Sequence, residues 1–125
     1  MRVGWLIGIC LLTVVLIFGG FAYANKSSVV IEAPATVKKG AEITIKVTAS
    51  HNANTRLHYT EWLRVMVNQK EVARWDFTGS NLPEGATFTR EIKLKTNETL
   101  EVTAEASCNN HGSKGPATVK ITVSD

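Results

Sequence analysis

The sequence has few cysteines and a small net charge, and each of these features excludes a class of protein or partner. It has two cysteines, and Cys10 lies in an uncharged N-terminal run. If that run is removed, Cys108 is the single thiol, which excludes an intramolecular disulfide framework. The 14 lysines and arginines against 11 acidic residues give a formal net charge of only +3. A charge this small and dispersed argues against nucleic acid or an anionic membrane surface as a partner.

The N-terminal run has the features of an export signal. Residues 3–24 carry no charge, follow the basic Arg2 and end in Ala22-Tyr23-Ala24, the small-x-small form that a signal peptidase accepts. We therefore predict a signal peptide over residues 1–24 and a periplasmic or secreted domain over residues 25–125. The alternative is an uncleaved N-terminal anchor, because a bilayer core needs about 20 apolar residues. The chain would contact a membrane only in that case.

Residues 25–125 have the length of one compact domain and lack a convincing helical period. Short runs of alternating apolar and polar residues, separated by turn residues, predict strands instead. The expected strands are 29–32, 42–48, 62–67, 72–77, 88–94, 100–106 and 117–123, with a turn region at 34–40 and a hairpin connection at 68–71. In the expected strand 88–94, Arg90 occupies one of the alternate positions at which the other residues are apolar and expected to face inward. About seven strands in this length predict an all-β, immunoglobulin-like β-sandwich.

Four residues with metal-binding side chains lie in two of the predicted loops. His51 and His58 lie between two strands, and Cys108 and His111 lie between the last two. Because the loops of a sandwich gather at its ends, these side chains can converge on one ion. A thiolate with imidazoles selects iron, copper or zinc over magnesium or calcium. Two alternatives stay open: surface histidines beside a small buried cysteine, or a reactive thiol next to His111.

The motifs around these residues resemble the iron domain of superoxide reductases, the neelaredoxin and desulfoferrodoxin family. Residues 30–34 resemble the family's opening strand and Lys39-Gly40 its first turn. The loop 51–58, with Trp62 following, resembles the paired-histidine loop. The segment Cys108-Asn109-Asn110-His111-Gly112 resembles the terminal ligand motif and is the most specific match.

This resemblance implies a ferrous ion with one axial thiolate, Cys108, and equatorial imidazoles from His51, His58 and His111. The family's fourth imidazole belongs to a Glu-Lys-His triplet before the opening strand, where this chain has Asn25-Lys26-Ser27. Lys26 keeps the lysine that attracts the anionic substrate, whereas Ser27 replaces a ligand. Water, an anion or the α-amino group of Asn25 are candidates for the vacant positions.

The resemblance further implies reduction of superoxide to hydrogen peroxide. Electrons would come from an external donor, rubredoxin-like or cytochrome-like, because the chain has no second cysteine cluster to hold another iron. A cupredoxin-like electron-transfer protein is the main alternative, although no methionine follows His111 to serve as the usual axial ligand of copper. A non-catalytic metal-binding or structural sandwich is a third hypothesis. Copper and zinc are the alternatives to iron.

Overall fold

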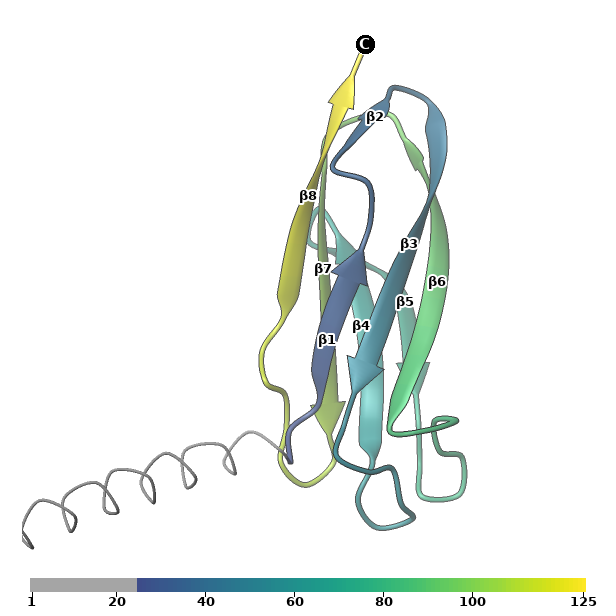
Figure 1. Ribbon diagram of the computed structural model, residues 1–125, viewed down its shortest axis with the longest axis vertical. Coiled ribbons are helices and arrows are strands. Elements are labelled where there is room, and N and C mark those ends of the chain that lie inside the picture. Colours follow the sequence, from purple (N-terminus) through teal and green to yellow (C-terminus); the bar gives the residue numbers. More distant parts are fainter. Residues whose placement is uncertain (1–24) are drawn as a thin grey trace, which may run out of the picture.

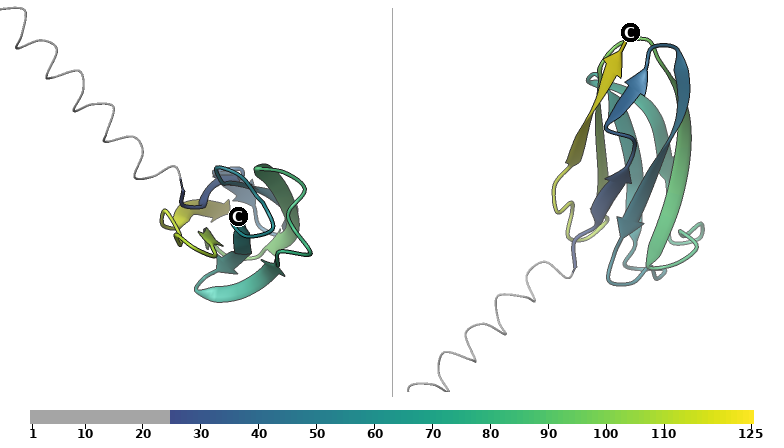
Figure 2. Two further views of the ribbon diagram at one scale, coloured as in Figure 1. Left: turned by 90° about the horizontal axis from the view of Figure 1, so that it is seen from below. Right: turned by 45° about the horizontal axis from the view of Figure 1, so that its top comes forward.

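The computed structural model describes residues 25–125, which form eight strands and no helix. The strands are β1 (Ser28–Glu32), β2 (Thr36–Lys38), β3 (Ala41–Ser50), β4 (Thr60–Val67), β5 (Lys70–Asp76), β6 (Thr87–Thr96), β7 (Leu100–Cys108) and β8 (Ala117–Ser124). Figures 1 and 2 show these strands as two layers that run along the long axis of the domain. The prediction of an all-β sandwich is confirmed.

The smaller sheet contains β1, β3 and β6 in the order β1-β3-β6, and both pairings are antiparallel. Its central strand β3 has strict alternation, with Ile43, Ile45, Val47 and Ala49 buried and the residues between them more exposed. Because successive side chains of a strand point to opposite faces, one face of β3 enters the core and the other meets water.

The larger sheet has the order β2-β8-β7-β4-β5. All its pairings are antiparallel except the short pairing of β2 with β8, which is parallel. β4 and β7 lie in the middle of this sheet and start or end beside the predicted ligand loops. Thr60 of β4 is paired with Cys108 of β7, so this register sets the two loops next to each other.

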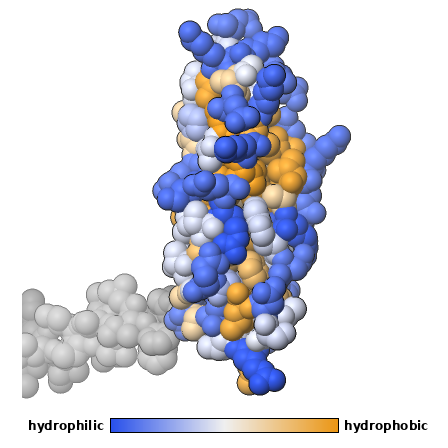
Figure 3. All heavy atoms as spheres, turned by 90° about the vertical axis from the view of Figure 1, so that its right-hand side faces the viewer, coloured by the Kyte–Doolittle hydropathy of each residue, from blue (hydrophilic) through white to orange (hydrophobic). Residues whose placement is uncertain are grey.

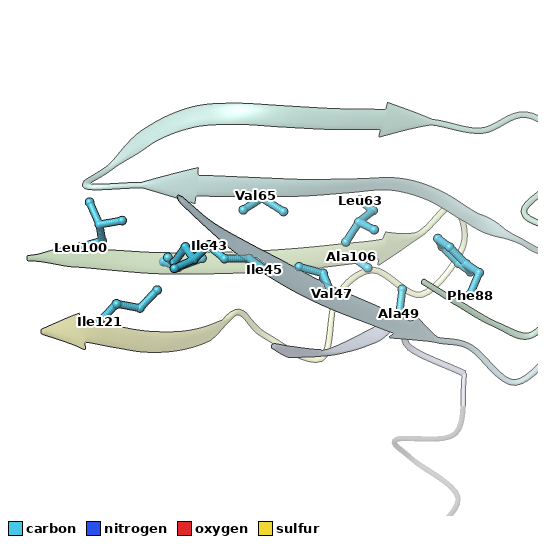
Figure 4. Packing of buried hydrophobic residues seen from close by; sticks show 12 residues of the cluster. Ile43, Ile45, Val47, Ala49, Leu63, Val65, Phe88, Leu100, Ala106 and Ile121 are labelled. Atoms are coloured by element: carbon cyan, nitrogen blue, oxygen red, sulfur yellow. The ribbon is translucent and has the colours of Figure 1, made fainter. Parts of the chain in front are cut away.

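The hydrophobic core lies between the two sheets. In Figure 4, side chains from β3 point toward side chains from β4, β7 and β8. The most deeply buried large ones include Ile45, Leu63, Val65, Val102 and Ile121. Full burial of one such side chain contributes about 1.5–3 kcal/mol relative to exposure, so this layer contributes much of the favourable free energy of folding.

The two sheets are not joined along the side formed by β5 and β6, which are edge strands of different sheets. Figure 3 looks onto this side and shows apolar atoms between polar ones in the half nearer the C-terminus. Arg90 of β6 is paired with the buried Val47, and paired residues point to the same face of a sheet, so Arg90 faces inward. The alternation of apolar residues in the sequence predicts the same orientation. Its guanidinium lies 5.2 Å from the ring centroid of Phe88 and hydrogen-bonds both carboxylate oxygens of Glu84.

Two details differ from the sequence prediction. The turn region 34–40 contains an additional strand, β2, whose three residues are too few to show alternation and which forms by pairing with β8. The β4–β5 connection is also shorter than expected, because Lys70 and Glu71 belong to β5. Only Asn68 and Gln69 form the turn, with φ angles of 49° and 68°. Two positive φ angles are typical of a type I′ hairpin, whose twist matches that of the strands.

The predicted signal peptide or anchor, residues 1–24, lies outside the described residues. Within residues 25–125, no helix has the length and hydropathy that a membrane span requires.

Candidate metal centre

Three segments that are distant in sequence meet at one end of the sandwich. They are residues 25–27 before β1, residues 51–59 between β3 and β4, and residues 109–116 between β7 and β8. Figure 1 shows them together at the end opposite the C-terminus. This arrangement brings His51, His58 and Cys108 close enough for their ligand atoms to lie within 4.8 Å of one another.

The loop between β3 and β4 is held in shape by Asn54. Its side-chain oxygen accepts a hydrogen bond of 2.7 Å from the backbone N–H of Thr60, and its amide nitrogen donates one of 2.7 Å to the carbonyl of Gly85. The same oxygen lies 3.3 Å from Nδ1 of His51. Asn54 thus fixes the path of the loop and the orientation of the first imidazole, a role that the sequence analysis did not identify.

Cys108 is the last residue of β7 rather than part of a loop as expected from the sequence, and it is only 2% exposed. The backbone N–H groups of Cys108 and Gly112 each donate to the other residue's carbonyl, at 2.9 and 3.0 Å. Gly112 has a φ of 78°, a conformation that glycine adopts without the steric penalty of a side chain. The backbone N–H of Asn110 lies 3.4 Å from the sulfur and donates to it, a contact of the kind that amides make with the sulfur ligands of metal sites.

Asn109 ties the two loops together. Its backbone N–H donates to the carbonyl of Tyr59, and its side-chain oxygen accepts from the N–H of Tyr59, both at 3.0 Å. Its side-chain nitrogen also donates to the carbonyl of Leu57. The spacing of His58 relative to Cys108 is therefore set by hydrogen bonds between the loops.

His111 completes the group through contacts with two of its members. Its Nδ1 lies 3.0 Å from Nε2 of His58 and 3.8 Å from the sulfur of Cys108. The rings of His51 and His58 meet edge to face, with centroids 4.6 Å apart, and those of His58 and His111 are 4.8 Å apart. All four residues predicted as metal ligands thus lie in one cluster, which we call the imidazole-thiol cluster.

The spacing of the imidazole-thiol cluster fits a metal ion. Bonds from a metal to imidazole nitrogen are about 2.0–2.1 Å and to thiolate sulfur about 2.3 Å, so two ligands at right angles lie about 3 Å apart and opposite ligands about 4.4 Å apart. The observed separations cover this range. The set of donors, three imidazoles and a thiol, is suited to iron, copper and zinc.

The surroundings of His58 favour its neutral imidazole, the form that binds metals. Burial lowers the pKa of His58 from its ordinary value of 6.5, and the nearby His51 and His111 lower it further. A main-chain hydrogen bond with Asn25 acts in the opposite direction on the pKa and is the smallest of these effects. His51 is 6% exposed, so this part of the site is largely shielded from solvent.

The segment before β1 brings Ser27 and Lys26 to the same end of the domain. Ser27 is fully buried, and its hydroxyl oxygen lies 2.8 Å from that of Thr60. Ser27, which the sequence resemblance aligns with a fourth imidazole, therefore has its hydroxyl in a hydrogen bond with another residue. Lys26 is half-buried, and its ammonium group makes no hydrogen bond or ion pair with residues 25–125.

Comparisons by sequence and by structure agree on one family. The sequence model of the desulfoferrodoxin family matches residues 21–114. No curated protein matches the chain by sequence.

Among solved structures, the chain is similar to a variant of the superoxide reductase (neelaredoxin) of Ignicoccus hospitalis, with 25% identity and a TM-score of 0.65 over 84% of this chain and 86% of that one. It is also similar to a candidate superoxide reductase of Thermotoga maritima, with 25% identity and a TM-score of 0.62 over 78% and 86% of the two chains. The sulfur carrier protein SoxY of Chlorobium limicola shares only the fold, at 16% identity and a TM-score of 0.56 over 78% and 79%.

Proposed function

Because the chain belongs to the desulfoferrodoxin family, we propose that residues 25–125 bind one iron ion and reduce superoxide to hydrogen peroxide. Family membership makes the chain an oxidoreductase of the superoxide reductase type and favours iron over the copper and zinc alternatives. The observation that carries the proposal for this chain is the imidazole-thiol cluster, which gathers His51 and His58 from the loop between β3 and β4, Cys108 from the end of β7 and His111 from the loop that follows.

In this proposal Cys108 holds the ion as a thiolate, and the three imidazoles hold it through neutral nitrogen atoms. An iron ion held by these residues would supply the one electron that, together with two protons from solvent, converts superoxide to hydrogen peroxide, and the external donor would restore the ferrous state. The backbone N–H of Asn110 donates to the Cys108 sulfur and so moderates the electron density that the sulfur can give. The hydrogen bond from His51 to Asn54 orients the ring for binding through Nε2.

Lys26 is proposed to attract the substrate. Superoxide is a small anion, and an ammonium group at this end of the domain that makes no ion pair with residues 25–125 raises the local concentration of anions. The exposed side chain of His111 lies on the same end of the domain, so solvent and substrate have access there.

The test is metal analysis of the purified protein combined with peroxide stoichiometry. We expect one iron per chain, a ferric-thiolate absorption band after oxidation, and loss of that band in Cys108→Ser. With an excess of reductant, one peroxide should form per superoxide consumed, whereas a dismutase would form half as much and release oxygen. Protein that binds no metal, or that binds copper with an intense blue band, would contradict the proposal.

We further propose that the protein acts outside the cytoplasm with a separate electron donor, rubredoxin-like or cytochrome-like. The sequence of residues 1–24 supports export. N-terminal sequencing of the exported protein should begin at Asn25; a chain that still begins at Met1 would support the anchor instead.

A further inference from the structure

The outer edge of β6 carries a pattern of charge that fits a second copy of the same strand. β6 lies at the edge of the smaller sheet and, among the described strands, pairs only with β3. We propose that the protein forms a two-fold symmetric dimer in which the β6 strands of two copies pair antiparallel, with the axis at Ile92. The two smaller sheets then become one continuous sheet. This interface does not depend on the proposed metal site.

The first observation is which backbone groups of β6 point away from β3. The carbonyls of Ala86 and Thr96 accept hydrogen bonds from residues on either side of β3. Because alternate residues of an antiparallel ladder bond the same neighbour, the even-numbered residues of β6 bond β3 and the odd-numbered ones face the open side. The carbonyl of Thr89 accepts a hydrogen bond from the Arg90 guanidinium. The edge that is open to a partner strand therefore lies over residues 91–95.

The second observation is that this open edge has both signs of charge on its outer face. Glu91 and Lys93 are exposed, and within the described domain the side chain of neither makes an ion pair or hydrogen bond. The other edge strand on this side, β5, differs, because its Arg74 forms ion pairs with Asp76 and Glu71. β6 thus has charges available for a partner, whereas these charges of β5 are already paired within the chain.

One antiparallel register of β6 with itself makes its charges complementary. With the two-fold axis at Ile92, Glu91 of each copy faces Lys93 of the other, so two opposite-charge pairs form. Moving the axis by one residue in either direction would place two glutamates or two lysines opposite each other, which is destabilising. Lysine in an edge strand commonly prevents edge pairing. Here the glutamate two residues away converts that repulsion into attraction.

The third observation is that apolar side chains on the inner face of this segment are only partly covered. Ile92 and Leu94 pack against the core but are not fully buried, and Figure 3 shows apolar atoms on this open side of the sandwich. In the proposed register Ile92 meets Ile92 of the second copy at a non-hydrogen-bonded position, where side chains of paired strands are closest. The pairing therefore removes apolar surface from water and also satisfies the backbone of the edge.

Charge reversal tests this register, because the two-fold axis repeats each substitution in both pairs. In Glu91→Lys a lysine would face Lys93, and in Lys93→Glu a glutamate would face Glu91. We expect the dissociation constant of the dimer to rise by about tenfold or more in each variant. An equimolar mixture of the two variants should regain the dimer, since every lysine at the interface then faces a glutamate. Sedimentation velocity of the purified protein over a range of micromolar concentrations measures the association.

Lys120→Glu is the matched control, because it makes the same change of charge on exposed β8 of the other sheet. It should leave the dissociation constant unchanged. A wild type that stays monomeric over the whole concentration range would overturn the inference. Association that survives both single reversals would also overturn it, as would a mixture that associates no better than either variant alone. None of these outcomes affects the proposed metal site, which is tested by iron content.

Discussion

Asn54 and Asn109 are the residues that position the ligands of the imidazole-thiol cluster. Neither carries a charge or binds the ion in our proposal, yet each uses both ends of its side-chain amide in hydrogen bonds. Ligand orientation by such partners is a general feature of metal sites, and their loss weakens metal binding even though the ligands remain.

Replacement of Asn54 by alanine tests this role. Asn54→Ala removes the partners of the Thr60 N–H and the Gly85 carbonyl, so we expect the free energy of unfolding to fall by about 1–3 kcal/mol. The loss of the His51 contact should weaken metal affinity by about 10–100-fold. Urea denaturation and metal titration measure the two effects.

Asn52→Ala is the matched control, because Asn52 is exposed in the same loop. An equal effect of both substitutions would show that loop composition, rather than the hydrogen bonds of Asn54, determines affinity.

The lowered pKa of His58 predicts how the metal-free protein responds to acid. Burial lowers this pKa most, followed by His51 and His111, so below pH 6.5 the folded chain binds fewer protons at His58 than the unfolded chain does. The free energy of unfolding should therefore be unaffected by this group well above pH 6.5 and should decrease as the pH falls below it. Urea midpoints measured across this range in wild type and His58→Asn check the prediction, since the variant should lose part of the decrease. A steeper decrease in His58→Asn would contradict it.

At the scale of elements, alternation in the sequence was enough to predict seven of the strands, because each contributes apolar residues at every second position to the core. β2 escaped prediction because its formation depends on a distant partner, β8, and not on its own three residues. Arg90 shows the opposite case. The alternation of apolar and polar residues predicted its place on the inner face, but only the structure shows its contacts with Glu84 and Phe88.

The β4–β5 turn gives a prediction at this scale. Gln69 has a φ of 68°, where a side chain costs energy that glycine avoids. We expect Gln69→Gly to raise the free energy of unfolding by about 0.5–1 kcal/mol, because Asn-Gly is the preferred pair for this turn. Chemical denaturation measures the change.

The neighbouring substitution Lys70→Gly is the control for that experiment, since Lys70 lies in β5 and glycine weakens a strand. Metal affinity should be the same in both variants, because the turn lies at the other end of β4 from the cluster. Destabilisation by Gln69→Gly would contradict the assigned turn conformation.

At the scale of the whole molecule, the sandwich brings together loops that are more than 50 residues apart, as in the contact of His58 with His111. The sequence predicted this convergence because loops of a sandwich can meet only at its two ends. The contact of the Asn25 carbonyl with His51 could not be predicted in the same way. A backbone oxygen is present at every residue, so no residue type marks the one that contacts a site.

The charge distribution of the molecule leads to a prediction about Lys26. In Lys26→Ala we expect the second-order rate constant for superoxide to decrease by roughly threefold to tenfold at low salt, with a weaker dependence on ionic strength. Pulse radiolysis or stopped flow at several salt concentrations measures this. Lys38→Ala removes the same charge from exposed β2 and should leave the rate unchanged. Loss of iron in Lys26→Ala, or an equal loss of rate in both variants, would contradict a steering role.

The C-terminus lies at the end of the long axis opposite the loops around the imidazole-thiol cluster (Figure 1), whereas the carbonyl of Asn25 contacts His51 of that cluster. This arrangement determines at which end a tag or a surface can be attached to the protein. A purification tag, bead or electrode joined through Asp125 leaves the histidines facing the solution, so an immobilised protein would remain open to its substrate. An added group joined at Asn25 would stand over the histidines and compete for the same space.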